Sequence, residues 1–116
     1  MDGFRSLVVW QRAIDLVRMV YAVANNFPAE ERYALTDQLR RAVVSIPANI
    51  AEGNGRASNK DYAHFLSIAR GSLYETLTHL EIAKQLDYLS DYTEIEALAA
   101  EIGRMLGSML KKYGAI

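Results

Sequence analysis

Apolar residues recur every three or four positions in four stretches of this chain, which is the period of an amphipathic α-helix. The first stretch ends before Pro28, which marks a connection. Ala13, Val20 and Phe27 widen its apolar face beyond a two-helix seam, so this helix is expected to pack against more than one neighbour. The predicted apolar series is Leu7, Trp10, Ile14, Val17, Tyr21 and Ala24.

A second helix is predicted to begin at Thr36, whose hydroxyl can accept a hydrogen bond from a first-turn amide. It should end near residues 53–55, where glycine can adopt a left-handed conformation. Pro47 inside it removes a backbone hydrogen bond and clashes with the preceding turn, at a cost of about 3 kcal/mol. We therefore expect a kink or break near residues 43–47, as a bend around the core or as a functional hinge. The predicted core positions are Leu39, Ala42 or Val43, Ile46 and Ile50.

The third stretch has the longest regular pattern. Ser58 and Asp61 resemble a capping box with Asp in place of Glu or Gln, and the helix is predicted to run to about Asp87. Its predicted core positions are Leu66, Ala69, Leu73, Thr76, Leu80 and Ala83. Small residues allow a neighbouring backbone to approach closely, so close packing is expected at Ala69, Gly71 and Ser72.

Asp91 and Glu94 repeat the capping pattern before a fourth helix, and Lys111 and Lys112 suit the negative pole of its dipole. Its predicted core positions are Ile95, Leu98, Ile102, Met105, Met109 and Tyr113. Four helices with short connections favour antiparallel neighbours. The predicted fold is therefore all-α: one domain over residues 1–116, an antiparallel up-and-down four-helix bundle with a second helix kinked at Pro47.

The composition supports a folded domain and limits the cellular compartments in which the protein is expected. The chain has 51% hydrophobic and 23% charged residues, which is typical of globular proteins, and it has no cysteine for disulfides or thiolate metal sites. Its first residues lack the order of a signal peptide, and no stretch has the roughly 20 apolar residues of a membrane span. A cytoplasmic protein without a membrane partner is expected.

The net charge of -1 argues against a strongly cationic nucleic-acid binder, because lysine and arginine supply most non-specific affinity for phosphates. The charge is nevertheless uneven. Residues 32–70 contain six basic and three acidic residues, whereas residues 71–116 contain four basic and seven acidic ones. The central segment could face an anionic partner such as RNA or DNA. The candidate nucleic-acid contacts are Arg40, Arg41, Arg56, Lys60 and Arg70.

No catalytic signature is present. The Glu-x-x-His pairs of di-iron bundles, hydrolase elbows, phosphate loops and dinucleotide fingerprints are all missing. Glu75 and His79 would share a helix face, and we interpret them as a surface ion pair in preference to a metal site. An enzyme using Glu52, Glu75 and His79 is the least favoured hypothesis, so no catalytic residue, metal or cofactor is predicted.

One polar series follows the second helix at steps of three and four. On a monomer it would be a solvated face, and in an oligomer it would be a polar subunit interface or ligand groove, where Arg and Asn pair with anions. The candidate interface residues are Gln38, Arg41, Ser45, Asn49 and Glu52, followed by Arg56.

Four segments carry a family resemblance: residues 7–13 (LVVWQRA), 33–42 (YxLxxQLRRA), 45–53 (SIPANIAEG) and 68–75 (IARGSLYE). In order and spacing they resemble the bacterial four-helix bundle proteins of the 23S rRNA intervening-sequence type, also called the S23 ribosomal protein family. The resemblance covers the chain from about Phe4 to Tyr113.

The resemblance implies a homopentameric ring around a central channel, with no established enzymatic activity. Related bundles include the accessory variability determinant of diversity-generating retroelements, a strongly basic pentamer that partners a reverse transcriptase and nucleic acid. The near-neutral chain departs from that relative. With the resemblance, we favour subunit assembly as the role of the polar stripe.

Two functions follow as hypotheses. The first is a non-catalytic homo-oligomer, expected to be a pentamer, that associates with RNA or DNA through the central cations. The alternative is a protein–protein scaffold without nucleic-acid binding, which would recruit a partner through exposed Tyr88 and Tyr92. Those tyrosines would instead be structural if they pack over the end of the bundle.

Overall fold

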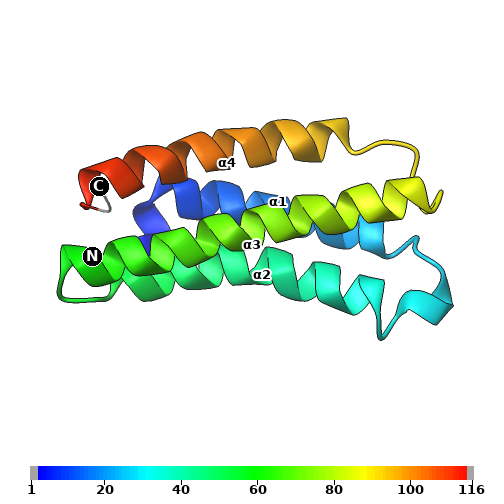
Figure 1. Ribbon diagram of the computed structural model, residues 1–116, viewed down its shortest axis with the longest axis horizontal. Helices are drawn as coiled ribbons and strands as arrows, with labels where there is room; N and C mark the ends of the chain where they lie inside the picture. The colour runs from blue at the N-terminus through cyan, green and yellow to red at the C-terminus, as the bar shows by residue number, and fades with distance from the viewer. Residues whose placement is uncertain (1–2, 115–116) are drawn as a thin grey trace.

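The computed structural model describes residues 3–114, which form four long α-helices and two short 3-10 helices. The helices are α1 (Val8–Ala24), α2 (Leu35–Asn54), α3 (Asn59–Gln85) and α4 (Thr93–Lys112), with η1 (Gly3–Ser6) before α1 and η2 (Ala29–Glu31) before α2. Figure 1 shows the chain reversing direction at each connection, so that the four long helices lie along one axis of the 43 × 21 × 20 Å molecule. The predicted all-α four-helix bundle is confirmed.

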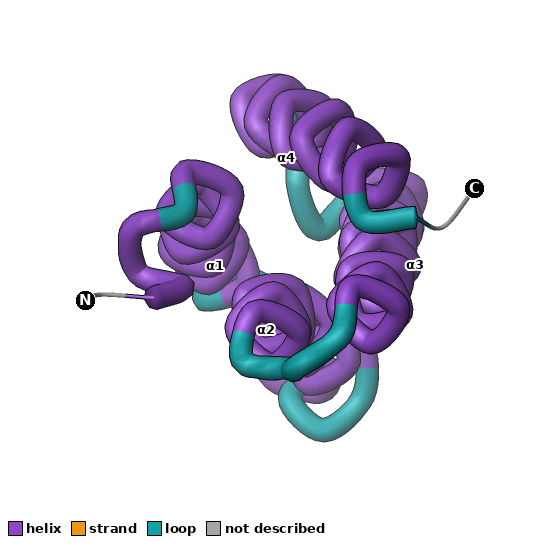
Figure 2. The backbone as a smooth tube through the Cα atoms, turned by 90° about the vertical axis from the view of Figure 1, so that its left-hand side faces the viewer, coloured by secondary structure: helices purple, strands orange, loops and turns teal. Residues whose placement is uncertain are grey.

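The end-on view shows the four long helices arranged around a common axis (Figure 2). Their buried side chains form one hydrophobic core. Each helix packs against two neighbours, and α2 with α3 forms the most extensive pair. The largest fully buried side chains come from all four helices and include Leu16, Leu39, Ile46, Leu66, Leu73, Ile102 and Leu106. Within residues 3–114, no helix combines the length and the apolar character needed to cross a bilayer.

The core positions of α2 and α3 agree with the prediction. All of the α2 positions are buried, whichever of Ala42 and Val43 is chosen, and all six α3 positions are buried. The α2 helix runs through Pro47 without a break, so the expected interruption is wrong at that residue, and the kink stays a prediction.

The rows of buried residues on α1 and α4 differ from the prediction. On α1 the buried side chains are Val9, Ala13, Leu16, Val20 and Ala24, whereas Tyr21 is exposed and the other four predicted residues are half-buried. On α4 the buried side chains are Ile95, Ala99, Ile102, Leu106 and Leu110. Both helices carry two adjacent rows of apolar residues, and only the position of the neighbouring helices determines which row is fully buried.

The start of α2 corrects one predicted cap. Thr36 lies inside the first turn and is buried, and the residue before the helix is Ala34, which makes no side-chain cap. The Leu35 amide instead donates to Glu31 Oε1 at 3.2 Å. A carboxylate from η2 therefore does what the Thr36 hydroxyl was expected to do.

The other helix ends agree more closely with the prediction. The Ser58 hydroxyl caps α3 by accepting from the Asp61 amide at 3.1 Å. Asp91 accepts from the Thr93 amide at 3.2 Å, although α4 itself begins after Tyr92. The α2 helix ends before Gly55 as expected, but Gly55 has a φ of -81° and is not left-handed.

Close packing of α2 against α3 occurs at Gly53. A Cβ atom at this position would lie 2.8 Å from Phe65 Cβ and 3.2 Å from the Tyr62 carbonyl oxygen. At Gly71, where a close approach was predicted, a Cβ atom would meet nothing within 4 Å. The prediction is therefore wrong for Gly71, while Ala69 and Ser72 are buried as expected.

Candidate functional site

The centre of the predicted polar stripe lies at the seam between α2 and α3. The Ser45 and Ser72 hydroxyl oxygens form a hydrogen bond of 2.9 Å across the seam. Asn49 Nδ2 donates to the Ser45 carbonyl oxygen at 2.8 Å and to Ser45 Oγ at 2.9 Å. Ser45 and Asn49 are half-buried. The Ser45–Ser72 bond joins the two helices within one subunit, and the Asn49 bonds, which lie within α2, hold Ser45 in place.

The outer residues of the stripe face solvent in the single chain. Gln38, Arg41 and Glu52 are exposed. Arg41 Nε donates to Asp37 Oδ2 at 3.0 Å, and Arg56 Nη2 donates to Glu52 Oε2 at 2.7 Å. Exposed pairs one helical turn apart contribute only about 0.3–0.5 kcal/mol each, so they leave this surface available for other contacts.

A second series on α3 runs beside this stripe, and we call it the α3 row. It contacts α2 through the Ser45–Ser72 hydrogen bond, and Arg56 of the α2–α3 connection places its guanidinium 4.8 Å from the centroid of the Phe65 ring. Three of its apolar side chains are exposed: Ile68 by 39%, Ile82 by 41% and Leu86 by 51%. The row consists of Phe65, Ile68, Ser72, Glu75, His79, Ile82 and Leu86.

The polar stripe and the α3 row together form one surface, the α2–α3 face. Sequence reasoning found its α2 half and missed its α3 half. The signal was present, because the α3 row has steps of three and four like the core series of the same helix. It was overlooked because polar residues interrupt the apolar ones.

Glu75 and His79 pair within the α3 row. His79 Nε2 lies 3.3 Å from Glu75 Oε2, but the histidine is only 8% exposed, so the predicted surface ion pair is half correct. Glu52, the third residue of the metal hypothesis, pairs with Arg56. Among residues 3–114, no group of three or more His, Cys, Asp or Glu side chains gathers as a metal site would require.

The five candidate nucleic-acid contacts do not form one surface. Arg40 and Arg41 lie in the first half of α2, and Arg56 and Lys60 lie at the α2–α3 connection, at the other end of the bundle (Figure 1). Arg40 is also engaged inside the subunit, because Nη2 donates to Asn25 Oδ1 at 3.0 Å.

Arg70 belongs to a different cationic cluster, which we call the α3–α4 hollow. This space of about 630 Å³ is lined by Arg70, Arg104 and Lys111 together with serine, glycine and leucine residues, and no carboxylate is among its described lining residues. None of the three cations forms a salt bridge with the described residues. The hollow is open at Gly107, where a Cβ atom would meet nothing within 4 Å.

Tyr88 and Tyr92 pack over one end of the bundle. The Tyr88 hydroxyl donates to Glu31 Oε2 at 2.7 Å, and its ring centroid lies 5.7 Å from that of Phe27. The Tyr92 hydroxyl donates to Glu81 Oε1 at 2.5 Å, which raises the pKa of Tyr92 to about 12. Both side chains are half-buried, so the structural interpretation of these tyrosines is correct.

The comparisons with known proteins agree on one family. Residues 5–108 match the family described as 23S rRNA-intervening sequence protein. The chain belongs to this family. A crystal structure of a protein of unknown function from the S23 ribosomal protein family of Bacteroides thetaiotaomicron is similar to this chain, with a TM-score of 0.78 and 29% identity over 90% of this chain and 99% of the other. No curated protein matches the chain.

Two of the four segments that carry the family resemblance lie on the α2–α3 face. Residues 45–53 supply Ser45, Asn49, Glu52 and the closely packed Gly53, and residues 68–75 supply Ile68 and Ser72. Both segments lie within the matched residues 5–108.

Proposed function

We propose that this protein is a non-catalytic module that assembles into a homo-oligomer, expected to be a pentamer, through its α2–α3 face. The observation that carries the proposal is the exposure of Ile68, Ile82 and Leu86 in one row, beside polar groups that are already hydrogen-bonded. Protein interfaces combine an apolar centre, which loses its water on assembly, with polar residues around it, and this face carries exposed apolar and polar side chains next to each other.

The dimensions of the α3 row support an interface. From Ile68 to Leu86 it extends for about 27 Å, at about 1.5 Å per helical residue. Together with the adjacent α2 stripe, this length suits the roughly 800 Å² that each partner buries in a stable complex. The net charge of -1 also produces little repulsion between copies.

The mass of the protein in solution tests this proposal. Light scattering at micromolar concentration should give five times the 13.0 kDa chain mass. Another closed oligomer would correct the stoichiometry and retain self-assembly. A monomer at this concentration would contradict the proposed function.

A second candidate function is association with RNA or DNA through the α3–α4 hollow. The observation that favours it is the convergence of Arg70, Arg104 and Lys111 on a space whose described lining holds no carboxylate. Lysine and arginine that are free of internal partners can neutralise phosphates and release counterions. Arg41 and Arg56 are less suited, because each already pairs with an acidic residue.

The scaffold alternative has less support in the molecule. It depended on exposed tyrosines, and Tyr88 and Tyr92 are engaged with Glu31 and Glu81. The mass measurement can separate the alternatives if it is repeated with a single-stranded RNA. A mass increase equal to bound RNA supports the nucleic-acid function, and an unchanged mass at low salt argues against it.

A further inference from the structure

Two buried polar atoms near the start of α2 have no hydrogen-bond partner among the described residues. They are Thr36 Oγ1 and Arg40 Nε. Thr36 is only 4% exposed, so water does not compensate its hydroxyl in the way it does at a surface. Nearly all buried polar atoms of native proteins are paired, and two exceptions one helical turn apart require an explanation.

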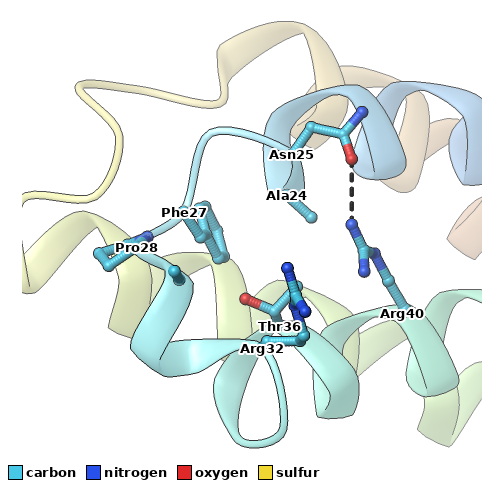
Figure 3. A pocket seen from close by; sticks show the side chains of 8 residues that line it. Ala24, Asn25, Phe27, Pro28, Arg32, Thr36 and Arg40 are labelled. Carbon is cyan, nitrogen blue, oxygen red and sulfur yellow. Dashed lines mark hydrogen bonds between the residues drawn. The ribbon is translucent and has the colours of Figure 1, made fainter.

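Both residues line the same pocket, which we call the α1–α2 pocket. It encloses about 300 Å³, and Arg32 adds a second guanidinium to its wall. Figure 3 shows Thr36, Arg32 and Arg40 around a space that is closed on another side by Ala24, Phe27 and Pro28. The described lining contains two cations and no carboxylate.

The Arg40 side chain is held in place before any ligand arrives. Its Nη2 donates to Asn25 Oδ1 at 3.0 Å, and its guanidinium carbon lies 5.2 Å from the centroid of the Tyr21 ring. The remaining Nε–H is therefore a fixed donor that no described side chain accepts from. A donor fixed in advance binds with a smaller loss of conformational entropy.

The position of the pocket in the fold adds to its preference for an anion. Thr36 lies in the first turn of the 20-residue α2 helix, where the helix dipole presents its positive end. The amide of Leu35 is already used by Glu31, whose negative charge offsets part of this field. The preference for an anion therefore rests mainly on the two guanidiniums and the hydroxyl.

We propose that the α1–α2 pocket binds the phosphate group of a small organic phosphate. Arginine recognises phosphate with several hydrogen bonds at once, and a threonine hydroxyl can donate one more. The volume exceeds that of a bare phosphate, and the apolar wall of Ala24, Phe27 and Pro28 suits the organic part of the ligand. This site is separate from the α2–α3 face and from the α3–α4 hollow, so it does not depend on the proposed function.

Calorimetric titration of the full-length protein with four probes tests the ligand class. Adenosine monophosphate should bind, inorganic phosphate should bind more weakly, and adenosine and succinate should show no binding. Equal binding of adenosine would overturn the proposal, because the phosphate would then contribute nothing. Stronger binding of succinate would assign the pocket to carboxylates, and the absence of binding by every probe would remove the site.

Substitutions locate the binding in the pocket. Arg32→Ala should weaken adenosine monophosphate binding about tenfold or more, as expected for a charge-assisted contact. The matched control is Arg18→Ala, which removes the same charge from an exposed residue of α1 that pairs with Asp15. An equal loss in both variants would show a non-specific charge effect and would contradict the proposal.

Thr36→Val supplies a readout that a purely structural role would not produce. The valine keeps the shape and removes the unpartnered hydroxyl, so the free protein should melt at a higher temperature. The same variant should bind adenosine monophosphate less tightly. Unchanged affinity in Thr36→Val would show that the hydroxyl takes no part in binding.

Discussion

Gly53 of α2 and Phe65 of α3 lie so close that a Cβ atom at position 53 would stand 2.8 Å from Phe65 Cβ. A Cβ is fixed to its backbone and cannot rotate away, so a side chain at position 53 would force the two helices apart. This contact therefore determines how closely the two halves of the α2–α3 face approach each other.

Gly53→Ala should destabilise the protein even though alanine is the better helix former. The gain in helix propensity is about 1 kcal/mol, whereas overpacking of a tight contact costs about 1–3 kcal/mol. We expect a net loss of up to about 2 kcal/mol in the free energy of unfolding, measured by urea denaturation at a fixed protein concentration. The matched control is Gly71→Ala, which meets open space and should gain about 0.5–1 kcal/mol. Equal effects of the two substitutions would refute the role of the contact.

Replacement of Asp87 by glycine should stabilise the protein. It ends α3 with a φ of 64°, and the Tyr88 amide closes the turn by donating to the Ala83 carbonyl oxygen at 2.9 Å. This left-handed position favours glycine. Asp87→Gly should raise the free energy of unfolding by about 0.5–1 kcal/mol, and Asp87→Ala should lower it. Thermal unfolding of the three proteins checks the order Gly, Asp, Ala.

Tyr92 should give the protein an alkaline dependence of stability. Its hydrogen bond to Glu81 raises the pKa of Tyr92 to about 12, above its usual value of 10.0. A raised pKa in the folded state means that the stabilisation is complete below pH 10 and is lost as the pH rises toward 12. Tyr92→Phe should therefore be less stable at pH 7 by about 0.5–1.5 kcal/mol, with a smaller difference at pH 12.

The same pair should also respond to acid. The Tyr92 hydroxyl, followed by Gln85, lowers the pKa of Glu81, so this contribution is lost when Glu81 is protonated at low pH. Denaturant melts at pH 3, 7 and 12 compare wild type with Tyr92→Phe. A difference that is the same at every pH would exclude the Glu81 carboxylate as the partner.

The introduction of additional charged residues into the α3 row should dissociate the oligomer. Ile68→Glu combined with Ile82→Glu places two unpaired charges in the proposed interface, which costs several kcal/mol. Light scattering should then show a monomer that retains its helical circular dichroism. The control is Val8→Glu, since Val8 is 51% exposed on α1 and outside the α2–α3 face. Dissociation by the control alone would move the interface to α1.

Removal of the cations in the α3–α4 hollow should change the salt dependence of RNA binding. Each phosphate neutralised on a single strand contributes about 0.7 to the slope of log affinity against log salt concentration. The triple variant Arg70→Ala, Arg104→Ala, Lys111→Ala should therefore reduce this slope by about 2. The matched variant Arg40→Ala, Arg41→Ala, Arg56→Ala should change it less, and the reverse order would favour the α2 cations.

The sequence predicted the core where one helix face is apolar and the other polar. On α2, Leu39 stands between Gln38 and Arg40, and on α3 the core series is longer and more regular than the α3 row beside it, so the buried face could be identified. On α1, Val8, Val9 and Trp10 are three consecutive apolar residues. Only the packing of α2 and α4 against this helix makes Val9 the buried one. Tertiary packing decides such cases.

The candidate sites were harder to predict because their residues meet across helices. Arg104 and Lys111 belong to the acidic part of the chain, so counting charge along the sequence hid their position beside Arg70. Their spacing of seven on α4 was the available signal. Thr36 was assigned to a cap from its residue type, whereas the carboxylate that binds the first amide of α2 comes from the preceding 3-10 helix.

Glu31 has a wider consequence than the start of one helix. Its Oε1 accepts from the Leu35 amide and its Oε2 accepts from the Tyr88 hydroxyl, so one carboxylate joins the α1–α2 connection to the α3–α4 connection. Both connections lie at the same end of the bundle (Figure 1). Opening of either one breaks a bond of the other, so this end of the molecule opens as a single cooperative unit in hydrogen exchange.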